Sequence, residues 1–157
     1  MHIRDIPITL TIALAAVGGP LGCGGERHHL HNVGKACIYP ATEPDGNPLW
    51  GATSARDYTA DGALNVAVFL GCLSSSCTEE ISASCTVQQT GSLVQVDAVG
   101  SYRDTGASAC STDCRPLLAR CETAPAAPGT VTLQYAGGSA DLLVPSSSPP
   151  PCIDAIP

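Results

Sequence analysis

The residues in this chain best suited to chemistry are its nine cysteines and four histidines. Thiolates and imidazoles bind zinc and copper, and either group can act in an enzyme as a nucleophile or base. The histidines are His2, His28, His29 and His31, so the sequence beyond residue 31 has none. The body of the chain therefore cannot form a Ser-His-Asp triad, a Cys-His pair or a histidine-built metal site unless the N-terminal segment folds back.

The cluster of His28, His29 and His31 is a weak candidate for a copper, nickel or zinc site, because His-rich tracts sometimes bind these metals. No cysteine or carboxylate stands at a matching spacing, and a disordered tract would lose backbone entropy before it could hold an ion. We therefore favour a polar segment without a metal, and we expect no cofactor.

The cysteine count separates Cys23 from the others, because an odd number of cysteines cannot all pair within one chain. Zinc is disfavoured, since the sequence has no C-x-x-C pair and no downstream histidine pair. We expect four disulfides, which would stabilise a core of mainly small apolar side chains, since only 4% of residues are aromatic. The eight cysteines that remain are Cys37, Cys72, Cys77, Cys85, Cys110, Cys114, Cys121 and Cys152.

The pairing of these eight cysteines is a hypothesis, because many connectivities are open to them. Cys85 and Cys121 each lie on the apolar face of a predicted strand, which suits a disulfide through the core. Short spacings favour two small loops, and one pair then joins the start of the domain to its tail. The expected pairs are Cys85–Cys121, Cys72–Cys77, Cys110–Cys114 and Cys37–Cys152.

Residues 1–22 have the features of a signal peptide. Arg4 lies in a short n-region, and the apolar stretch 6–17 is too short to cross ~30 Å of hydrocarbon but suits an h-region. The run "PLGC", Pro20 to Cys23, resembles the end of a bacterial lipoprotein signal, whose cysteine becomes the lipidated first residue of the mature protein. The glycine before the cysteine fits this pattern, whereas Pro20 departs from it.

We therefore predict that Cys23 is lipidated. Ordinary cleavage near Ala13 to Gly18, giving a secreted protein, and an uncleaved anchor are the alternatives. A free Cys23 would be an exposed thiol in an oxidising compartment, which is chemically unfavourable. A lipid-anchored domain needs a polar connection to the membrane, so we predict that residues 23–36 form a flexible, histidine-containing tether.

The segment 37–145 has the pattern of an all-β domain. Apolar and polar residues alternate along several short runs, separated by turn residues. The final two runs form a hairpin, with Gly137 and Gly138 at its turn. These features predict an antiparallel β-sandwich. The expected strands are Asn65–Leu70, Ile81–Gln89, Leu93–Tyr102, Leu117–Glu122, Thr130–Tyr135 and Ala140–Pro145.

Two segments lack this alternation. Residues 40–60 contain three prolines and the only tryptophan, Trp50, and are predicted to form an irregular arm with Trp50 packed on the sandwich. Residues 146–157 form a Pro- and Ser-rich tail, which we expect Cys152 to hold in place.

The domain contains the motifs "CLSSSC" (72–77), "ASCTV" (83–87), "ARCE" (119–122) and "PGTVTLQYAGGSADLLVPS" (128–146). In these motifs the chain resembles a group of small, uncharacterised, Cys-rich lipoproteins of the myxobacterial type. The resemblance implies a lipoprotein signal and an all-β domain, and it implies no activity.

An immunoglobulin-like sandwich is one candidate architecture, because Cys85 and Cys121 stand at a suitable separation for an inter-sheet disulfide. No tryptophan lies between them, and Ala119 stands where that fold would place the tyrosine of its tyrosine corner. We predict the sandwich and leave immunoglobulin ancestry open.

The charge balance excludes one class of partner. The chain has 14 acidic and 7 basic residues, a net charge of -7, and no basic run, whereas nucleic-acid binding needs clustered Lys and Arg. We expect a non-enzymatic, lipid-anchored protein of the cell envelope, at the outer membrane or cell surface, that contacts the membrane through its anchor and also a protein or envelope partner.

Two alternatives remain. An enzyme without histidine could use a carboxylate pair, and Glu79 with Glu80 is the only adjacent pair. A protein that binds a small ligand, sugar or metal would need aromatic or acidic side chains. The candidates for that role are Trp50, Tyr58, Tyr102, Asp57, Asp61 and Asp104.

Overall fold

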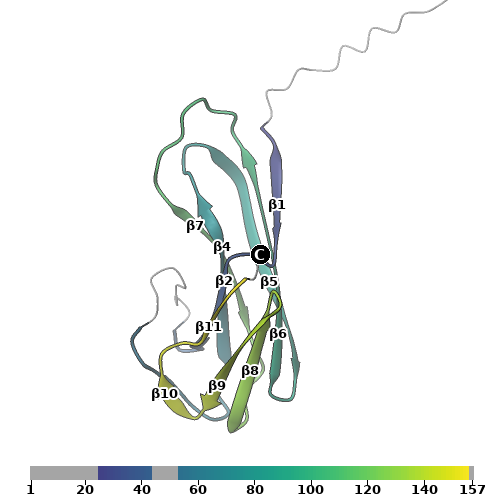
Figure 1. The fold of residues 1–157 in the computed structure, drawn as a ribbon, viewed down its shortest axis with the longest axis vertical. Helices are drawn as coiled ribbons and strands as arrows, with labels where there is room; N and C mark the ends of the chain where they lie inside the picture. Colours follow the sequence, from purple (N-terminus) through teal and green to yellow (C-terminus); the bar gives the residue numbers. More distant parts are fainter. Residues whose placement is uncertain (1–24, 44–52, 156–157) are drawn as a thin grey trace, which may run out of the picture.

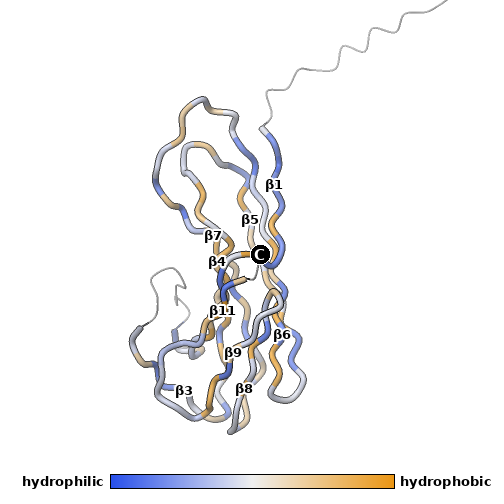
Figure 2. Tube along the Cα trace, viewed as in Figure 1, coloured by the Kyte–Doolittle hydropathy of each residue, from blue (hydrophilic) through white to orange (hydrophobic). Residues whose placement is uncertain are grey.

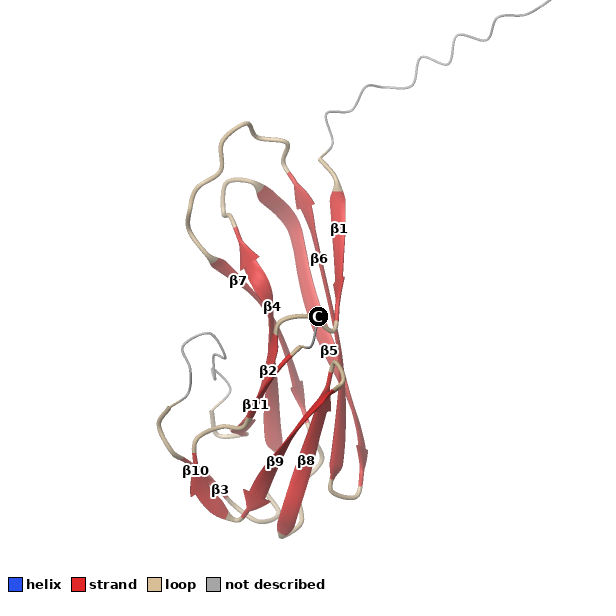
Figure 3. Cartoon of the chain, viewed as in Figure 1, coloured by secondary structure: helices blue, strands red, loops and turns tan. Residues whose placement is uncertain are grey.

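A computed structural model describes residues 25–43 and 53–155 of the chain. All regular structure in these residues is β, which confirms the all-β prediction (Figure 3). The strands are β1 (Arg27–His31), β2 (Lys35–Pro40), β3 (Arg56–Tyr58), β4 (Leu64–Leu73), β5 (Thr78–Thr90), β6 (Leu93–Asp104), β7 (Arg115–Glu122), β8 (Gly129–Tyr135), β9 (Gly138–Val144), β10 (Ser146–Ser148) and β11 (Cys152–Asp154).

The strands form two facing sheets and a small ribbon (Figure 1). In the first, the β6 sheet, β5 pairs along the length of β6, while β1 and β8 share the other side of β6 and β9 pairs with β8. The second, the β4 sheet, has the order β11-β2-β4-β7. All of these pairs are antiparallel except β6 with β8, and β3 pairs with β10 in the ribbon.

The core lies between the two sheets and is built from alternate residues of their strands (Figure 2). Val66 and Val68 of the β4 sheet and Val94 and Val96 of the β6 sheet are all buried there. Gly100 lets the layers approach, because a Cβ at this position would lie 2.8 Å from Leu70 Cδ1. The predicted alternation on the main strands therefore has the expected cause, which is one face in the core and one in solvent.

The segment 23–36 is not a flexible tether in its described part. β1 pairs antiparallel with the C-terminal half of β6, from Arg27 opposite Arg103 to His31 opposite Val99. Leu30 packs against the core, while the residues on either side of it are more exposed. β1 thus supplies backbone partners to a stretch of β6 that would otherwise be an open edge, and this long-range pairing outweighs the polar composition.

Asn32 extends this pairing beyond the end of β1. Its backbone N–H donates to the carbonyl of Ala98 (2.9 Å), and its side-chain oxygen accepts the N–H of Ala98 (2.8 Å). Asn32 has a φ of 49°, a conformation that asparagine adopts more readily than most residues. The side chain therefore replaces a strand residue in the gap on β6 between β1 and β8.

The arm and the tail also contain strands. Arg56–Tyr58 of the predicted arm pairs with Ser146–Ser148 of the predicted tail, and β11 pairs with β2. Trp50 lies outside the described residues. In the last hairpin the turn consists of Ala136 and Gly137, with φ values of 48° and 82° as in a type I′ turn, and Gly138 already belongs to β9.

The eight cysteines of the described residues form four disulfides. Cys37–Cys152 and Cys85–Cys121 are present as predicted, the second joining the edge strands β5 and β7 rather than crossing the middle of the core. The two predicted small loops are wrong. Of the observed pairs, Cys77–Cys110 links the β4–β5 loop to the β6–β7 loop, and Cys72–Cys114 links the end of β4 to the β6–β7 loop. The two loops lie side by side at one end of the sandwich (Figure 1).

Candidate functional site

The histidines of β1 make structural contacts with carboxylates of β6. His28 Nε2 lies 2.7 Å from Asp104 Oδ2, and its ring stacks on Tyr102 with centroids 4.7 Å apart. His31 Nε2 lies 2.8 Å from Asp97 Oδ1. Successive strand residues point to opposite faces, so His28 is turned away from His29. In the part of the chain that is described, no three metal-binding side chains come together.

Asp97 accepts hydrogen bonds from two neighbours of different kinds. Asn32 Nδ2 donates at 2.9 Å, and His31 is the second partner. These hydrogen bonds, that of Asn32 first, lower the pKa of Asp97 because they stabilise the carboxylate. The arrangement holds β1 on β6 and does not resemble a catalytic pair.

The carboxylates of Glu79 and Glu80 are neutralised by arginines. Arg103 Nη2 lies 2.9 Å from Glu79 and 2.7 Å from Glu80, and Arg27 also pairs with Glu80. The adjacent glutamates therefore belong to an ion-pair cluster between β1, β5 and β6.

The two cross-linked loops carry a network of hydroxyl groups, which we call the serine network. Ser111 Oγ lies 2.9 Å from Ser74 Oγ, Ser76 Oγ donates to Ser111 Oγ at 3.1 Å, and Ser111 donates to Asp113. The hydrogen bonds from Ser111 and Ser75 lower the pKa of Asp113, which makes it a poor base. This exposed network is suited to holding the loops together or to hydrogen bonding at a surface.

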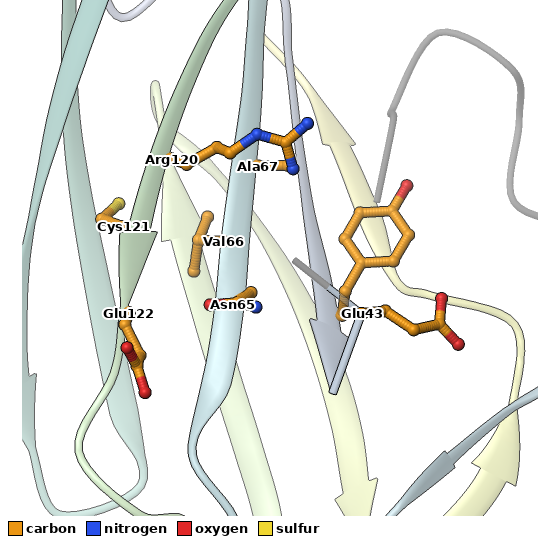
Figure 4. A pocket seen from close by; sticks show the side chains of 8 residues that line it. Glu43, Asn65, Val66, Ala67, Arg120, Cys121 and Glu122 are labelled. Carbon is orange, nitrogen blue, oxygen red and sulfur yellow. The ribbon is translucent and has the colours of Figure 1, made fainter. Parts of the chain in front are cut away.

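A hollow of about 250 Å³ lies on the outer face of the β4 sheet (Figure 4). Strand register places Tyr39, Asn65 and Glu122 in one row across β2, β4 and β7, and Ala67 beside Arg120 in the next. The small side chain of Ala67 packs with Cys37 and Tyr39, and larger side chains such as Arg120 and Glu122 also line the hollow. We call it the β4-face hollow.

The hydroxyl of Tyr39 is the most unusual group in this hollow. Tyr39 is 1% exposed, and its hydroxyl has no hydrogen-bond partner among the described residues. Burial raises its pKa. By contrast, the buried hydroxyls of Tyr58 and Tyr135 donate to the carbonyls of Ile38 and Val33 at 3.0 and 2.7 Å. A buried polar group without a partner costs free energy, so a polar ligand atom that reached the Tyr39 hydroxyl would relieve this cost.

Other polar groups border this hydroxyl. Glu43 lines the β4-face hollow and accepts from Arg56 Nε at 2.5 Å, while Asn65 Nδ2 donates to the carbonyl of Ala41 at 3.3 Å. Arg120 lies beside Ala67, its register partner on the neighbouring strand, and both line the hollow (Figure 4). The site thus offers carboxylate, amide, guanidinium and phenol groups within one small volume.

The binding residues proposed from the sequence lie elsewhere. Tyr58 is buried in the core, Tyr102 stacks under His28, and Asp104 is paired with His28. Asp57 lies on β3 and Asp61 in the following turn. The hollow was missed, because its residues come from three strands whose register has no local sequence signal.

The four disulfides in the described residues place the protein outside the cytoplasm, in an oxidising compartment. Over the same residues there is no helix long and apolar enough to cross a membrane. Comparisons with protein-family models, with curated proteins and with solved structures found no match.

Proposed function

We propose that this protein is a lipid-anchored, non-enzymatic component of the cell envelope, held by Cys23 after removal of residues 1–22. The observation that carries the proposal is the pairing of cysteines. All eight cysteines of the described residues are bonded to one another, which leaves Cys23 as the odd one, at the end of a lipoprotein-like signal. A thioether to lipid accounts for that cysteine without a free thiol.

The polar side chains support a binding role over catalysis. The described histidines of β1 stand beside carboxylates or in solvent, and Glu79 and Glu80 are engaged by arginines. The sandwich is a disulfide-bonded scaffold that presents its outer faces to a protein or envelope partner. We place it at the outer membrane or cell surface, with secretion as the alternative.

Replacement of Cys23 tests the anchor. In cells that make the full chain, Cys23→Ser should move the protein from the membrane fraction to the soluble fraction and should abolish incorporation of labelled fatty acid. Glu26→Gln, three residues along the chain, is the matched control and should remain in the membrane fraction. Membrane retention and lipid labelling of the Cys23→Ser protein at the level of the natural chain would rule the anchor out.

A second candidate function is the binding of a small neutral polar ligand, such as a sugar, in the β4-face hollow. The buried Tyr39 hydroxyl without a partner favours it. A ligand that binds the folded state raises the melting temperature, so thermal melts against sugars and divalent metals should reveal a shift with a sugar. Tyr39→Phe should abolish this shift, and Tyr135→Phe, outside the hollow, should keep it. A shift with metals alone would contradict this candidate.

A further inference from the structure

The point of attachment proposed above lies very close to the folded sandwich. Cys23 precedes Gly25, the first described residue, by two positions, and two residues of extended chain reach at most ~7 Å. Gly25 itself packs against the end of β6, because a Cβ on it would overlap the carbonyl oxygen of Asp104. The backbone carbonyl of the next residue, Glu26, accepts a hydrogen bond from the backbone N–H of Asp104 at 2.9 Å.

This junction is fixed to the sandwich. β1 follows at once, with five residues in register on β6, and its side chains add the pairs Arg27–Glu80, His28–Asp104 and His31–Asp97. Leu30 packs against the core. A lipid at Cys23 would therefore hold one end of the sandwich near the membrane, because only Gly24 separates Cys23 from Gly25 in the sequence.

The end that carries the start of β1 also carries the two cross-linked loops, 74–77 and 105–114 (Figure 1). Half of the residues in these loops are Ser or Thr, and the only charged one is Asp113. Thr105 ties the base of one loop to the other, donating its N–H to the carbonyl of Cys77 at 2.8 Å. We call the two loops, 74–77 and 105–114, the serine end.

The chemistry of the serine end fits a phospholipid surface. The chain carries a net charge of -7, and that charge would repel anionic headgroups wherever acidic residues gather. The two loops 74–77 and 105–114 contribute one carboxylate, that of Asp113, and many exposed hydroxyls, which can hydrogen-bond phosphate and ester oxygens. The other carboxylates near this end are paired, Glu79 and Glu80 with Arg103 and Asp104 with His28. Its two disulfides hold this surface in shape, and its loops contain no large apolar side chain that would insert into the hydrocarbon.

We infer that the serine end rests on the phospholipid headgroups of the membrane that holds Cys23, and that the sandwich stands on it with the β5–β6 turn at Gly91 pointing away. This inference rests on the proposed lipid anchor. Because β6 has 12 residues and a strand rises ~3.4 Å per residue, the far end stands roughly 35–40 Å from the membrane surface. The partner is then bound by the far end or the sheet faces.

The test uses the mature protein, extracted from its membrane and reconstituted in vesicles of phosphatidylcholine and phosphatidylglycerol that contain a paramagnetic headgroup lipid. Intact mass first reports the lipid at Cys23. The amide signals of Ser75, Ser76 and Ser111 should then be lost, while those of Gly91 and Ser92 should remain. Equal loss at both ends, or loss at Gly91 alone, would overturn the inference and leave the anchor standing. A mass without lipid would overturn both proposals.

Two variant pairs separate contact from mere proximity. Ser75→Glu with Ser108→Glu adds negative charge at the serine end and should restore its amide signals on these vesicles. Thr90→Glu with Ser92→Glu adds the same charge at the far end and should leave the loss at the serine end unchanged. Equal behaviour of the two pairs would overturn the claim that the serine end touches the headgroups.

Discussion

Among single residues, the tyrosine hydroxyls separate a structural role from a binding role. Tyr58 and Tyr39 are both buried, but Tyr58 donates to the carbonyl of Ile38, whereas the Tyr39 hydroxyl has no partner among the described residues. The first hydroxyl stabilises the fold, because its loss would leave a buried carbonyl without its donor. The second makes no such hydrogen bond within the described residues.

These two tyrosines give a matched prediction for stability. Tyr58→Phe should lower the free energy of unfolding by about 1 kcal/mol or more, and Tyr39→Phe should leave it unchanged or raise it by up to about 1 kcal/mol. Urea denaturation followed by fluorescence measures both. A loss for Tyr39→Phe as large as that for Tyr58→Phe would mean that the Tyr39 hydroxyl already has a structural partner.

Asp97 predicts an acid-dependent loss of stability. Its pKa is lowered in the folded protein by Asn32 and His31, so its carboxylate stabilises the fold fully at pH values above the unfolded pKa of about 3.9. This contribution is lost as pH falls from that value through the lower folded pKa. Asp97→Asn should therefore flatten the fall in stability in this range.

The measurement is urea denaturation at a series of acidic pH values. Asp57→Asn, at an exposed position of β3, is the control, and it should leave the dependence of stability on pH closer to that of the natural chain. If Asp97→Asn and the natural protein lose stability in parallel between these pKa values, the contacts of Asp97 with β1 contribute nothing to folding.

At the scale of strands and disulfides, the arrangement of the cross-links predicts unequal contributions. Cys37–Cys152 spans 115 residues of sequence. Cys72–Cys114 encloses Cys77–Cys110, so either of these two, when alone, already closes most of the same loop. Because a disulfide stabilises by restricting the unfolded chain, the first should matter more than one member of the nested pair.

Removal of Cys37–Cys152 by two alanine substitutions should lower the free energy of unfolding by ~2–5 kcal/mol. Removal of Cys72–Cys114 in the same way should cost less, because Cys77–Cys110 stays in place. Denaturant midpoints of the two variants measure the difference. A larger loss for the Cys72–Cys114 variant would show that local geometry at the serine end, and not loop closure, dominates.

Most strands of the two sheets could be predicted from the sequence, because β5, β6, β8 and β9 alternate clearly between core and solvent. β1 could not be predicted, since four of its five residues are polar. Its pairing partner β6 also lies more than 60 positions away in the sequence, as in the pair His31 and Val99. The short strands β3, β10 and β11 exist through long-range pairing, which leaves no local pattern. For the same reason the nested disulfides were predicted as separate loops.

The candidate site was less predictable than the fold. Tyr39, Asn65 and Arg120 come from three strands, and only the register brings them around Ala67. The predicted handles Tyr58 and Asp104 were assigned by residue type, and the fold uses both in structural contacts instead.

For the whole molecule, three features determine where the protein is placed and how it is oriented. The disulfides place the chain in an oxidising compartment, the odd cysteine suggests the anchor, and the strand that follows the anchor ties it to one end of the sandwich. If Cys23 carries the proposed lipid, β1 would set the orientation of the sandwich on the membrane. This orientation follows from the replacement of the predicted tether by a strand.

The intact mass of the mature protein, measured with and without reduction, is the most direct test of the proposed lipid anchor at Cys23. We predict a mature chain that begins at Cys23, carries the added mass of a lipid, and gains the mass of eight hydrogen atoms on reduction, two for each of four disulfides. A mature chain without lipid, or one in which Cys23 has been removed by cleavage or is paired with another cysteine, would contradict it.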